Sequence, residues 1–229
     1  MNTLIFDCDG VLVDSETIAE TTLVELLGAW LPDLAAEEEL KAALGMTTAN
    51  ILTHLEARSA HRLPARAAAR VDDTIEARLR RELCAIEGVA EAIASLTLPL
   101  AVVSNSRRQR VLDSLAITGL ESRLGEIPIF TADQAAAPKP DPAIYRLAAA
   151  ELSCAPGDCL VVEDSVSGVT AAHGAGMTVI GFTGASHVPA GQAERLREAG
   201  AWQILPHMHG LETLVRQWQA ARQPVVDSR

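Results

Sequence analysis

Short apolar runs alternate with amphipathic stretches through the last two thirds of the chain, and this alternation constrains the fold more than any other feature of the sequence. The runs have the length of strands buried on both faces, whereas the stretches between them repeat apolar residues at helical spacing. Strands and helices in regular alternation predict βαβ units, so we expect an α/β fold with a doubly wound parallel sheet. The predicted strands are the opening run that ends at Asp7 and residues 98–103, 127–131, 159–162, 178–182 and 202–205.

A segment without strand-like runs, residues 15–82, interrupts this pattern directly after the first strand. Its apolar residues recur at helical spacing in four stretches, and the first of these stops before Pro32. The pattern predicts a small all-α cap domain inserted into a larger domain. We therefore expect residues 1–14 and 83–222 to form the core, residues 15–82 to form the cap, and residues 223–229 to form a flexible tail.

The composition argues against several classes of partner. The formal net charge is −11 at pH 7, and a strongly negative chain is repelled by nucleic acid and by anionic membranes. No apolar run approaches membrane-spanning length, and the first strand begins too close to Met1 for a signal peptide, so we expect a cytoplasmic protein. The four cysteines lack zinc-ligand spacing and are interpreted as reduced thiols. Monomer and homodimer are both open.

Polar side chains follow three of the predicted strands at the point where each strand ends. The carboxyl ends of parallel strands lie at one edge of a sheet, where such folds bind their ligands, so we expect these side chains to meet. Each pair alone has a plainer interpretation, as an Asx-Gly turn, a helix N-cap or loop charge. Their shared position at strand ends favours one common site. The three pairs of polar residues at the strand ends are Asp7 and Asp9, Ser104 and Asn105, and Glu163 and Asp164.

Four carboxylates at one edge of a sheet require a cation among them. Two like charges about 4 Å apart repel by roughly 4 kcal/mol at an effective dielectric constant near 20. Oxygen ligands without His or Cys nearby suit Mg²⁺, which commonly shares its coordination shell with a phosphate group of the substrate. Lys139, between Pro138 and Pro140, is a second candidate cation, with a solvated surface lysine as the alternative. Ser104 is a candidate for binding a phosphate oxygen.

Four motifs of the chain resemble those of the haloacid dehalogenase (HAD) superfamily, and the resemblance spans nearly the whole sequence. The helical insert after the first motif resembles the C1-type cap of the subgroup that contains β-phosphoglucomutase and small sugar-phosphate phosphatases. The resemblance implies a Rossmann-like HAD core with an all-α cap. The motifs are Asp7-x-Asp9-Gly10-Val11-Leu12-Val13-Asp14-Ser15, Val103-Ser104-Asn105-Ser106, Lys139-Pro140-Asp141-Pro142, and Val162-Glu163-Asp164-Ser165 with Gly168.

The resemblance implies phosphoryl transfer through an aspartyl-phosphate. Asp7 would attack phosphorus, and Asp9 would protonate the leaving oxygen and then activate water. An acid at position 9 favours a phosphate ester as substrate, because the dehalogenases and phosphonatases of the superfamily lack it. The implied enzyme is a phosphoric monoester hydrolase that acts on a small phosphorylated metabolite, either a sugar phosphate or a related monoester.

The resemblance also implies which residues bind the ligands. The implied Mg²⁺ ligands are Asp7, the backbone carbonyl of Asp9, Asp164, and Glu163 either directly or through water. The implied phosphate ligands are Ser104, Asn105 and Lys139. Lys139 would also offset the charge of the nucleophile. The expected specificity residues are Thr48 in the cap, and Arg107 and Arg108 after the second motif.

Two alternatives to a phosphatase are open. The β-phosphoglucomutases carry a His in the first cap helix and an Arg in the cap loop, where this chain has Ala19 and Thr48, and this difference favours hydrolysis over a mutase. A non-catalytic receiver-like module that binds phosphate and Mg²⁺ would gain nothing from a cap, whereas a hydrolase uses one to control water. His187, in the loop after the strand that ends at Phe182, is a candidate for the border of the site, with a surface position as the plainer alternative.

Overall fold

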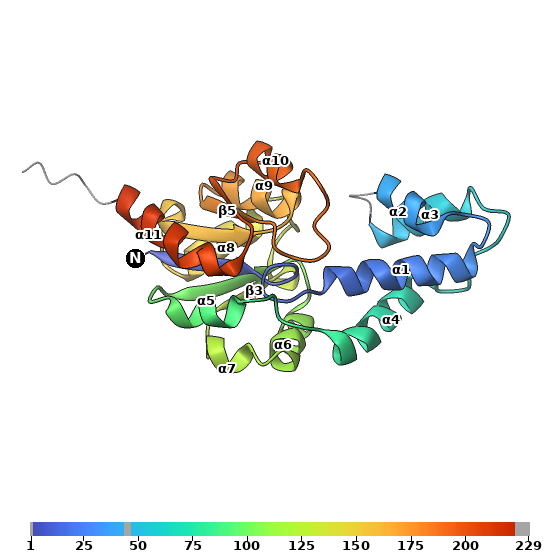
Figure 1. Cartoon of the computed structure of the whole chain (residues 1–229), viewed down its shortest axis with the longest axis horizontal. Helices are drawn as coiled ribbons and strands as arrows, with labels where there is room; N and C mark the ends of the chain where they lie inside the picture. The colour runs from blue at the N-terminus through green and yellow to red at the C-terminus, as the bar shows by residue number, and fades with distance from the viewer. Residues whose placement is uncertain (1, 44–46, 223–229) are drawn as a thin grey trace, which may run out of the picture. The chain divides into compact units, whose positions relative to one another are not determined.

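The computed structural model describes residues 2–43 and 47–222 of the chain (Figure 1). The chain divides into two compact units, one formed by Met1–Asp14 with Cys84–Arg229 and the other by Ser15–Leu83. Leu83, which we expected in the core, belongs to the second unit because its N–H bonds to the carbonyl of Leu79 and continues the last turn of a cap helix. The predicted tail, residues 223–229, lies outside the described residues.

Within the described part of the first unit, six parallel strands form one sheet in the order β3-β2-β1-β4-β5-β6. The strand order runs outward in both directions from the β1–β4 pair, which is the doubly wound arrangement. The predicted fold class is confirmed, and each predicted strand is present with bounds that shift by two residues or fewer. The strands are β1 Thr3–Asp7, β2 Leu100–Ser104, β3 Ile129–Thr131, β4 Cys159–Glu163, β5 Thr178–Phe182 and β6 Gln203–Leu205.

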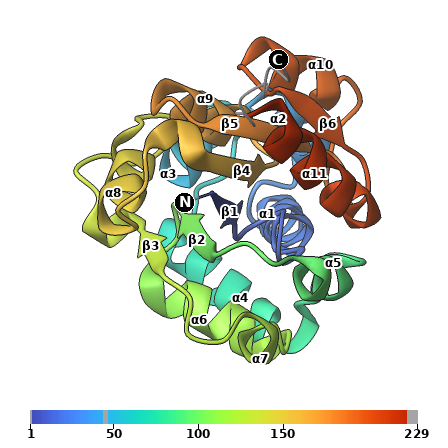
Figure 2. The same cartoon turned by 90° about the vertical axis from the view of Figure 1, so that its left-hand side faces the viewer.

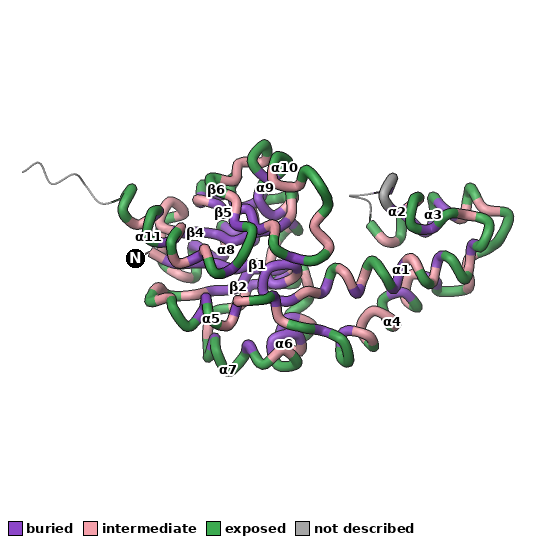
Figure 3. The backbone as a smooth tube through the Cα atoms, viewed as in Figure 1, coloured by how far each residue is buried: buried purple, intermediate pink, exposed green. Residues whose placement is uncertain are grey.

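Helices cover both faces of the sheet (Figure 2). One face carries α8 (Ala143–Glu151), α9 (Val166–Gly174) and α10 (Gln192–Glu198), and the other carries α5 (Val89–Ser95), α6 (Arg108–Ile117) and α11 (Leu211–Ala221). Shorter elements are α7 (Glu121–Leu124), η1 (Ala132–Gln134), η2 (Pro156–Asp158) and η3 (Met208–Gly210). Because both faces are covered, β1 and β4 are buried along their whole length (Figure 3), and all their residues are apolar except Thr3, Asp7 and Glu163 at their ends.

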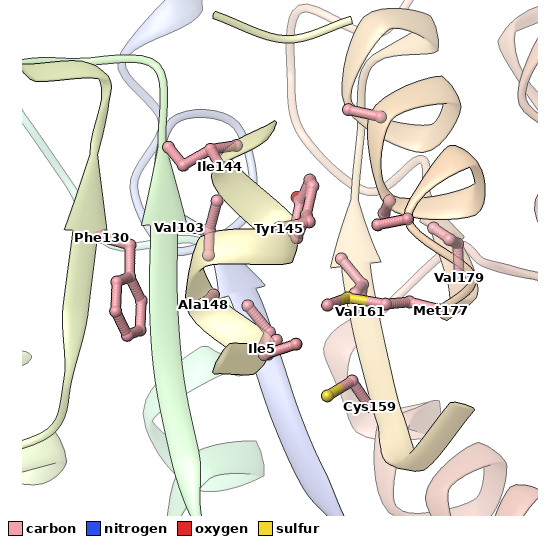
Figure 4. Packing of buried hydrophobic residues seen from close by; sticks show 14 of the residues in the cluster. Ile5, Val103, Phe130, Ile144, Tyr145, Ala148, Cys159, Val161, Met177 and Val179 are labelled. Atoms are coloured by element: carbon pink, nitrogen blue, oxygen red, sulfur yellow. The ribbon is translucent and has the colours of Figure 1, made fainter. Parts of the chain in front are cut away.

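The packing of α8 on the sheet holds the strand ends in place. Ile144, Tyr145 and Ala148 of this helix are completely buried, and they pack in one apolar cluster with Ile5 of β1 and Val103 of β2 (Figure 4). Burial of a large apolar side chain stabilises a fold by about 1.5–3 kcal/mol. The cluster therefore gives the edge of the sheet a rigid base.

The second unit is all helical over its described residues, as predicted. Its helices are α1 (Glu16–Trp30), α2 (Ala36–Ala42), α3 (Thr48–Glu56) and α4 (Ala67–Glu82). Leu27, Leu55 and Val71 are almost completely buried in their common core. Arg78 of α4 joins α1 by an ion pair with Glu25, at 3.1 Å. Among the described residues of both units, no helix is long and apolar enough to cross a membrane.

Candidate active site

The ends of three neighbouring strands bring the predicted site residues to one edge of the sheet. Asp7, the last residue of β1, is in register with Val103 of β2, and the residue before it, Phe6, is in register with Val162 of β4. The strands are parallel, so the polar residues that follow Val103 and Val162 lie on either side of Asp7. The common edge expected from the sequence is confirmed.

The turn after β1 requires glycine at position 10. Gly10 has a φ of +80°, in the left-handed region that side chains disfavour, and its N–H donates to the carbonyl of Val13 at 2.8 Å. A Cβ atom at this position would overlap Oδ2 of Asp164. The glycine therefore allows the backbone after β1 to lie directly against the carboxylate of Asp164.

Lys139 is the cation at the centre of the site. Its Nζ donates to Oδ1 of Asp7 at 2.5 Å, to Oε1 of Glu163 at 2.5 Å, and to the carbonyl of Val103 at 3.3 Å. The residue is only 7% exposed, so the alternative of a solvated surface lysine is wrong. All three N–H bonds of the ammonium group have acceptors, which satisfies its hydrogen-bonding capacity.

The side chain of Asn105 holds the backbone of Lys139. Its Oδ1 accepts from the N–H of Lys139 at 2.9 Å, and its Nδ2 donates to the carbonyl of the same residue at 3.3 Å. The expected role of Asn105 in binding phosphate stays a prediction beside this contact. This contact joins two loops that are distant in the sequence, so sequence spacing did not predict it.

Glu163 is fully buried and is bonded on both carboxylate oxygens. The hydroxyl of Tyr145 donates to Oε1 at 2.7 Å, and Oγ of Ser165 donates to Oε2 at 3.2 Å. Gly168, named above with the fourth motif, makes room for this carboxylate, because a Cβ atom there would overlap it. Sequence reasoning missed Tyr145. Its position in the sequence could have predicted the contact. The chain's single tyrosine lies just after the Lys139 motif, and the hydroxyl group of a buried tyrosine requires a hydrogen-bond partner.

Asp9 is held by residues of the second motif. Its Oδ2 accepts from Oγ of Ser104 at 3.1 Å and from Oγ of Ser106 at 2.8 Å, and its Oδ1 lies 3.9 Å from a guanidinium nitrogen of Arg110. The alternative of Ser104 as a helix N-cap is wrong, because Arg107 occupies the N-cap position of α6. Ser106 and Arg110 were missed, although Ser106 lies inside the motif and Arg110 follows it by one helical turn.

Three carboxylates of the site are close enough to share one metal ion. Asp7, Glu163 and Asp164 are all buried, and each offers an oxygen within 4.8 Å of the oxygens of the other two. One lysine does not neutralise three carboxylates, and a hard divalent cation with oxygen ligands would complement the remaining charge. His187 lies at this cluster, with Nε2 at 3.2 Å from Oδ2 of Asp164, so the border position is confirmed for this residue.

Burial and mutual repulsion shape the protonation of the cluster. Burial raises the pKa of Asp7, and Lys139 opposes this shift while Glu163 reinforces it. Burial also raises the pKa of Asp164, against the hydrogen bond from His187. For Lys139, burial lowers the pKa, but the attraction of Asp7 and Glu163 outweighs it and leaves the pKa above its usual value. Without a metal ion, the acidic cluster therefore resists full ionisation.

The predicted specificity residues are not part of this hydrogen-bonded cluster as described. Thr48 is the first residue of α3 in the second unit and is half-buried. Arg107 and Arg108 are exposed at the start of α6, and a guanidinium nitrogen of Arg108 donates to the carbonyl of Ile129 at 2.8 Å. Their roles in specificity stay predictions.

A doubly wound sheet whose carboxyl edge joins an aspartate pair, a buried lysine and a second acidic pair defines a hydrolase of the HAD class. Residues 4–182 match the family of haloacid dehalogenase-like hydrolases, and the chain belongs to this family. This confirms the resemblance found in the motifs.

Individual relatives agree with the family. The chain is 32% identical over 187 residues to 6-phosphogluconate phosphatase of Escherichia coli (strain K12), covering 80% of this chain and 83% of the relative. A haloacid dehalogenase-like protein from Agrobacterium tumefaciens has a similar structure, with a TM-score of 0.86, 38% identity, and coverage of 96% of this chain and 99% of that one. A HAD family hydrolase from Deinococcus radiodurans, solved with bound phosphate and sodium, has a TM-score of 0.81 and 29% identity, covering 96% of each chain. The family and the phosphatase among these relatives confirm the predicted enzyme class.

Proposed function

We propose that the protein is a Mg²⁺-dependent phosphatase that hydrolyses a small phosphorylated metabolite, such as a sugar phosphate, through an aspartyl-phosphate on Asp7. The observation that carries the proposal is the arrangement around this residue. Its carboxylate is buried, contacts the ammonium group of Lys139 at 2.5 Å, and is followed two residues later by Asp9, which two serines hold by hydrogen bonds. This arrangement supports Asp7 as the nucleophile, Lys139 as the cation that offsets its charge, and Asp9 as the acid/base group.

The reaction has two steps, and the same residues take part in both. In the first step, a carboxylate oxygen of Asp7 forms a bond to phosphorus while the bond from phosphorus to the ester oxygen breaks, and Asp9 gives its proton to that leaving oxygen. In the second step, Asp9 takes a proton from a water molecule, whose oxygen attacks phosphorus. The bond between phosphorus and Asp7 breaks, which releases inorganic phosphate and restores the free carboxylate.

Mg²⁺ would be held by Asp7, Asp164 and the backbone carbonyl of Asp9, and it would supply a positive charge for the phosphate oxygens. Glu163 fits a contact through water better than a direct one, because Lys139 and Tyr145 already donate to Oε1 and Ser165 donates to Oε2. Ser104 and Lys139 would bind the transferred phosphoryl group. Asn105 would act by holding Lys139 in position.

The relatives support the proposed substrate class. A curated relative is named for its action on 6-phosphogluconate, and a similar structure was solved with phosphate. We propose that Arg107, Arg108 and Thr48 contribute to the choice of substrate. A cytoplasmic location and a monomeric or homodimeric state, as predicted from the sequence, complete the proposal.

The experiment is an assay of phosphate release from a panel of sugar phosphates, sugar-acid phosphates and p-nitrophenyl phosphate, with Mg²⁺ and with a chelator. We expect release that requires Mg²⁺ and no detectable turnover for Asp7→Asn. For Asp9→Asn, we expect turnover slower by about 10²–10⁴-fold, the usual contribution of a general acid/base group. Asp73→Asn, an exposed aspartate of α4, is the matched control and should retain parental activity.

Two results would contradict the proposal. The absence of phosphate release from every substrate, with the parent folded and Mg²⁺ present, would favour a binding module. An isomeric sugar phosphate as the product, in place of inorganic phosphate, would favour a mutase. Mass spectrometry of the rapidly quenched reaction should find a phosphoryl group on the peptide that contains Asp7.

A further inference from the structure

The loop between β5 and α10 and the first residue of α10 contact Asp164 at two points and Asp14 at one. Nε2 of His187 lies 3.2 Å from Oδ2 of Asp164, and Nε2 of Gln192 donates to the backbone carbonyl of Asp164 at 2.7 Å. Oγ of Ser186 donates to Oδ2 of Asp14 at 2.5 Å. The loop and the start of α10 therefore hold both the side chain and the backbone of Asp164, a residue of the acidic cluster.

The contacts around Asp164 distinguish its two carboxylate oxygens. A Cβ atom at Gly10 would overlap Oδ2 and would lie 3.1 Å from Cε1 of His187, so Oδ2 lies between the backbone of residue 10 and the imidazole ring. A carboxylate oxygen can only accept, so the Nε2 atom that faces it must carry a proton. The side chain of Asp164 is 6% exposed and that of His187 is 18% exposed, so water competes little for this contact.

We infer that His187 is a positioning residue of the cation site: its Nε2–H holds Oδ2 of Asp164 and thereby presents Oδ1 to the divalent cation. This inference rests on the proposed function, because it requires the cation. His187 does not contact the reacting atoms in this role. Groups that bond to a metal-ligating carboxylate orient it, and their loss typically weakens metal binding by about 10–100-fold.

The loop does not depend on His187 for its attachment. Gln192 and Ser186 contact Asp164 and Asp14 independently of the imidazole. Replacement of His187 should therefore leave the loop in place and remove only the hydrogen bond to Oδ2. This separates a positioning role from a general structural one.

The experiment measures Mg²⁺ binding to the metal-free, full-length protein by titration calorimetry, without substrate. We expect His187→Leu to raise the Kd for Mg²⁺ by about tenfold or more. His187→Gln places an N–H near the position of Nε2 and should bind Mg²⁺ within about threefold of the parent, whereas His187→Asn lacks that reach and should resemble the Leu variant. His207→Leu, at an exposed histidine of the same unit, is the control and should match the parent.

The outcomes separate this inference from the proposed function. If His187→Leu and His187→Asn bind Mg²⁺ like the parent while Asp164→Asn binds it weakly, the positioning role is wrong and the cation site stands. If the parent itself binds no Mg²⁺, the proposed function fails and the inference fails with it. If a thermal melt shows that the His187→Leu variant is not folded, the Mg²⁺ affinities of the His187→Gln and His187→Asn variants still test the inference. Weak Mg²⁺ binding by both of these variants would overturn the role of the Nε2–H.

Discussion

Gly168 in the first turn of α9 lies so close to the carboxylate of Glu163 that a Cβ atom at position 168 would overlap Oε2. The same carboxylate accepts from Lys139 at 2.5 Å and from Tyr145 at 2.7 Å. The glycine is therefore part of the geometry that holds the lysine beside Asp7.

Gly168→Ala should displace Glu163 and thereby weaken its hold on Lys139. Overpacking of a buried position typically lowers the free energy of unfolding by about 1–3 kcal/mol, and misplacement of catalytic groups by about 1 Å lowers the rate by roughly 100-fold. Chemical denaturation and steady-state kinetics test both effects. The control is Gly174→Ala in the same helix, where the nearest atom is 3.8 Å away, and it should be neutral or stabilising. Equal behaviour of the two variants would refute the steric argument.

Lys139→Met should both abolish turnover and destabilise the protein. It leaves the buried carboxylates of Asp7 and Glu163 without a counter-ion, and loss of one partner from a buried ion pair typically costs about 3–5 kcal/mol. Lys139→Arg keeps the charge. The three acceptors surround the compact ammonium group of the lysine, however, and the planar guanidinium group of an arginine does not fit this arrangement. We expect the Arg variant to fold better than the Met variant and to remain inactive. Full activity of Lys139→Arg would show that charge alone is sufficient.

Ser106→Ala should lower kcat with little change in KM. The hydroxyl of Ser106 donates to Oδ2 of Asp9 at 2.8 Å, which is shorter than the 3.1 Å contact of Ser104. Loss of one hydrogen bond to a charged group is worth about 1.5–3 kcal/mol, so the expected decrease in kcat is roughly tenfold or more. Ser106→Thr keeps the hydroxyl and should recover most of the rate. Ser122→Ala, on an exposed surface, is the control. An unchanged kcat in Ser106→Ala would remove this residue from the site.

Stability should depend on pH through Asp164 in the metal-free protein. Burial raises its pKa above the value of an unfolded aspartate, so the folded state holds the proton more tightly. The contribution of Asp164 to the free energy of unfolding therefore decreases as the pH rises from the ordinary aspartate range up to the pKa of Asp164 in the folded state. Asp164→Asn lacks this titration, so metal-free parent should lose stability relative to the variant as the pH is raised from about 3 to 7.

Thermal melts of both proteins with a chelator measure this difference. Saturating Mg²⁺ should stabilise the parent most at neutral pH, because metal binding requires ionised carboxylates. It should have little effect on Asp164→Asn. A parallel pH dependence of the two metal-free proteins would contradict the prediction.

Much of the core was predictable because its signals are local. The apolar run of residues 159–162 predicts a buried strand, and β4 has these residues with Glu163 added. A parallel sheet then places the residue after each strand at one edge, which is why Asp7, Ser104 and Glu163 could be predicted to share a site. The short helix α7 was not predicted, because four residues carry no measurable helical period.

The partners of each site residue were not predictable, because they depend on contacts across the fold. The contact by which Asn105 holds Lys139 was not predicted, and neither were the contacts of Tyr145 and Ser106. Each of these contacts depends on distances of about 3 Å, and such distances follow from strand register and helix packing.

The sequence by itself determined the class of fold and the groups available for chemistry, because hydrophobic periodicity and the motifs at strand ends are properties of adjacent residues. Only the tertiary structure decided which oxygen of each carboxylate is bonded, which groups surround Lys139, and why glycine is required at positions 10 and 168. The physical reason is that hydrogen bonds and steric overlap are sensitive to fractions of an ångström between segments far apart in the chain.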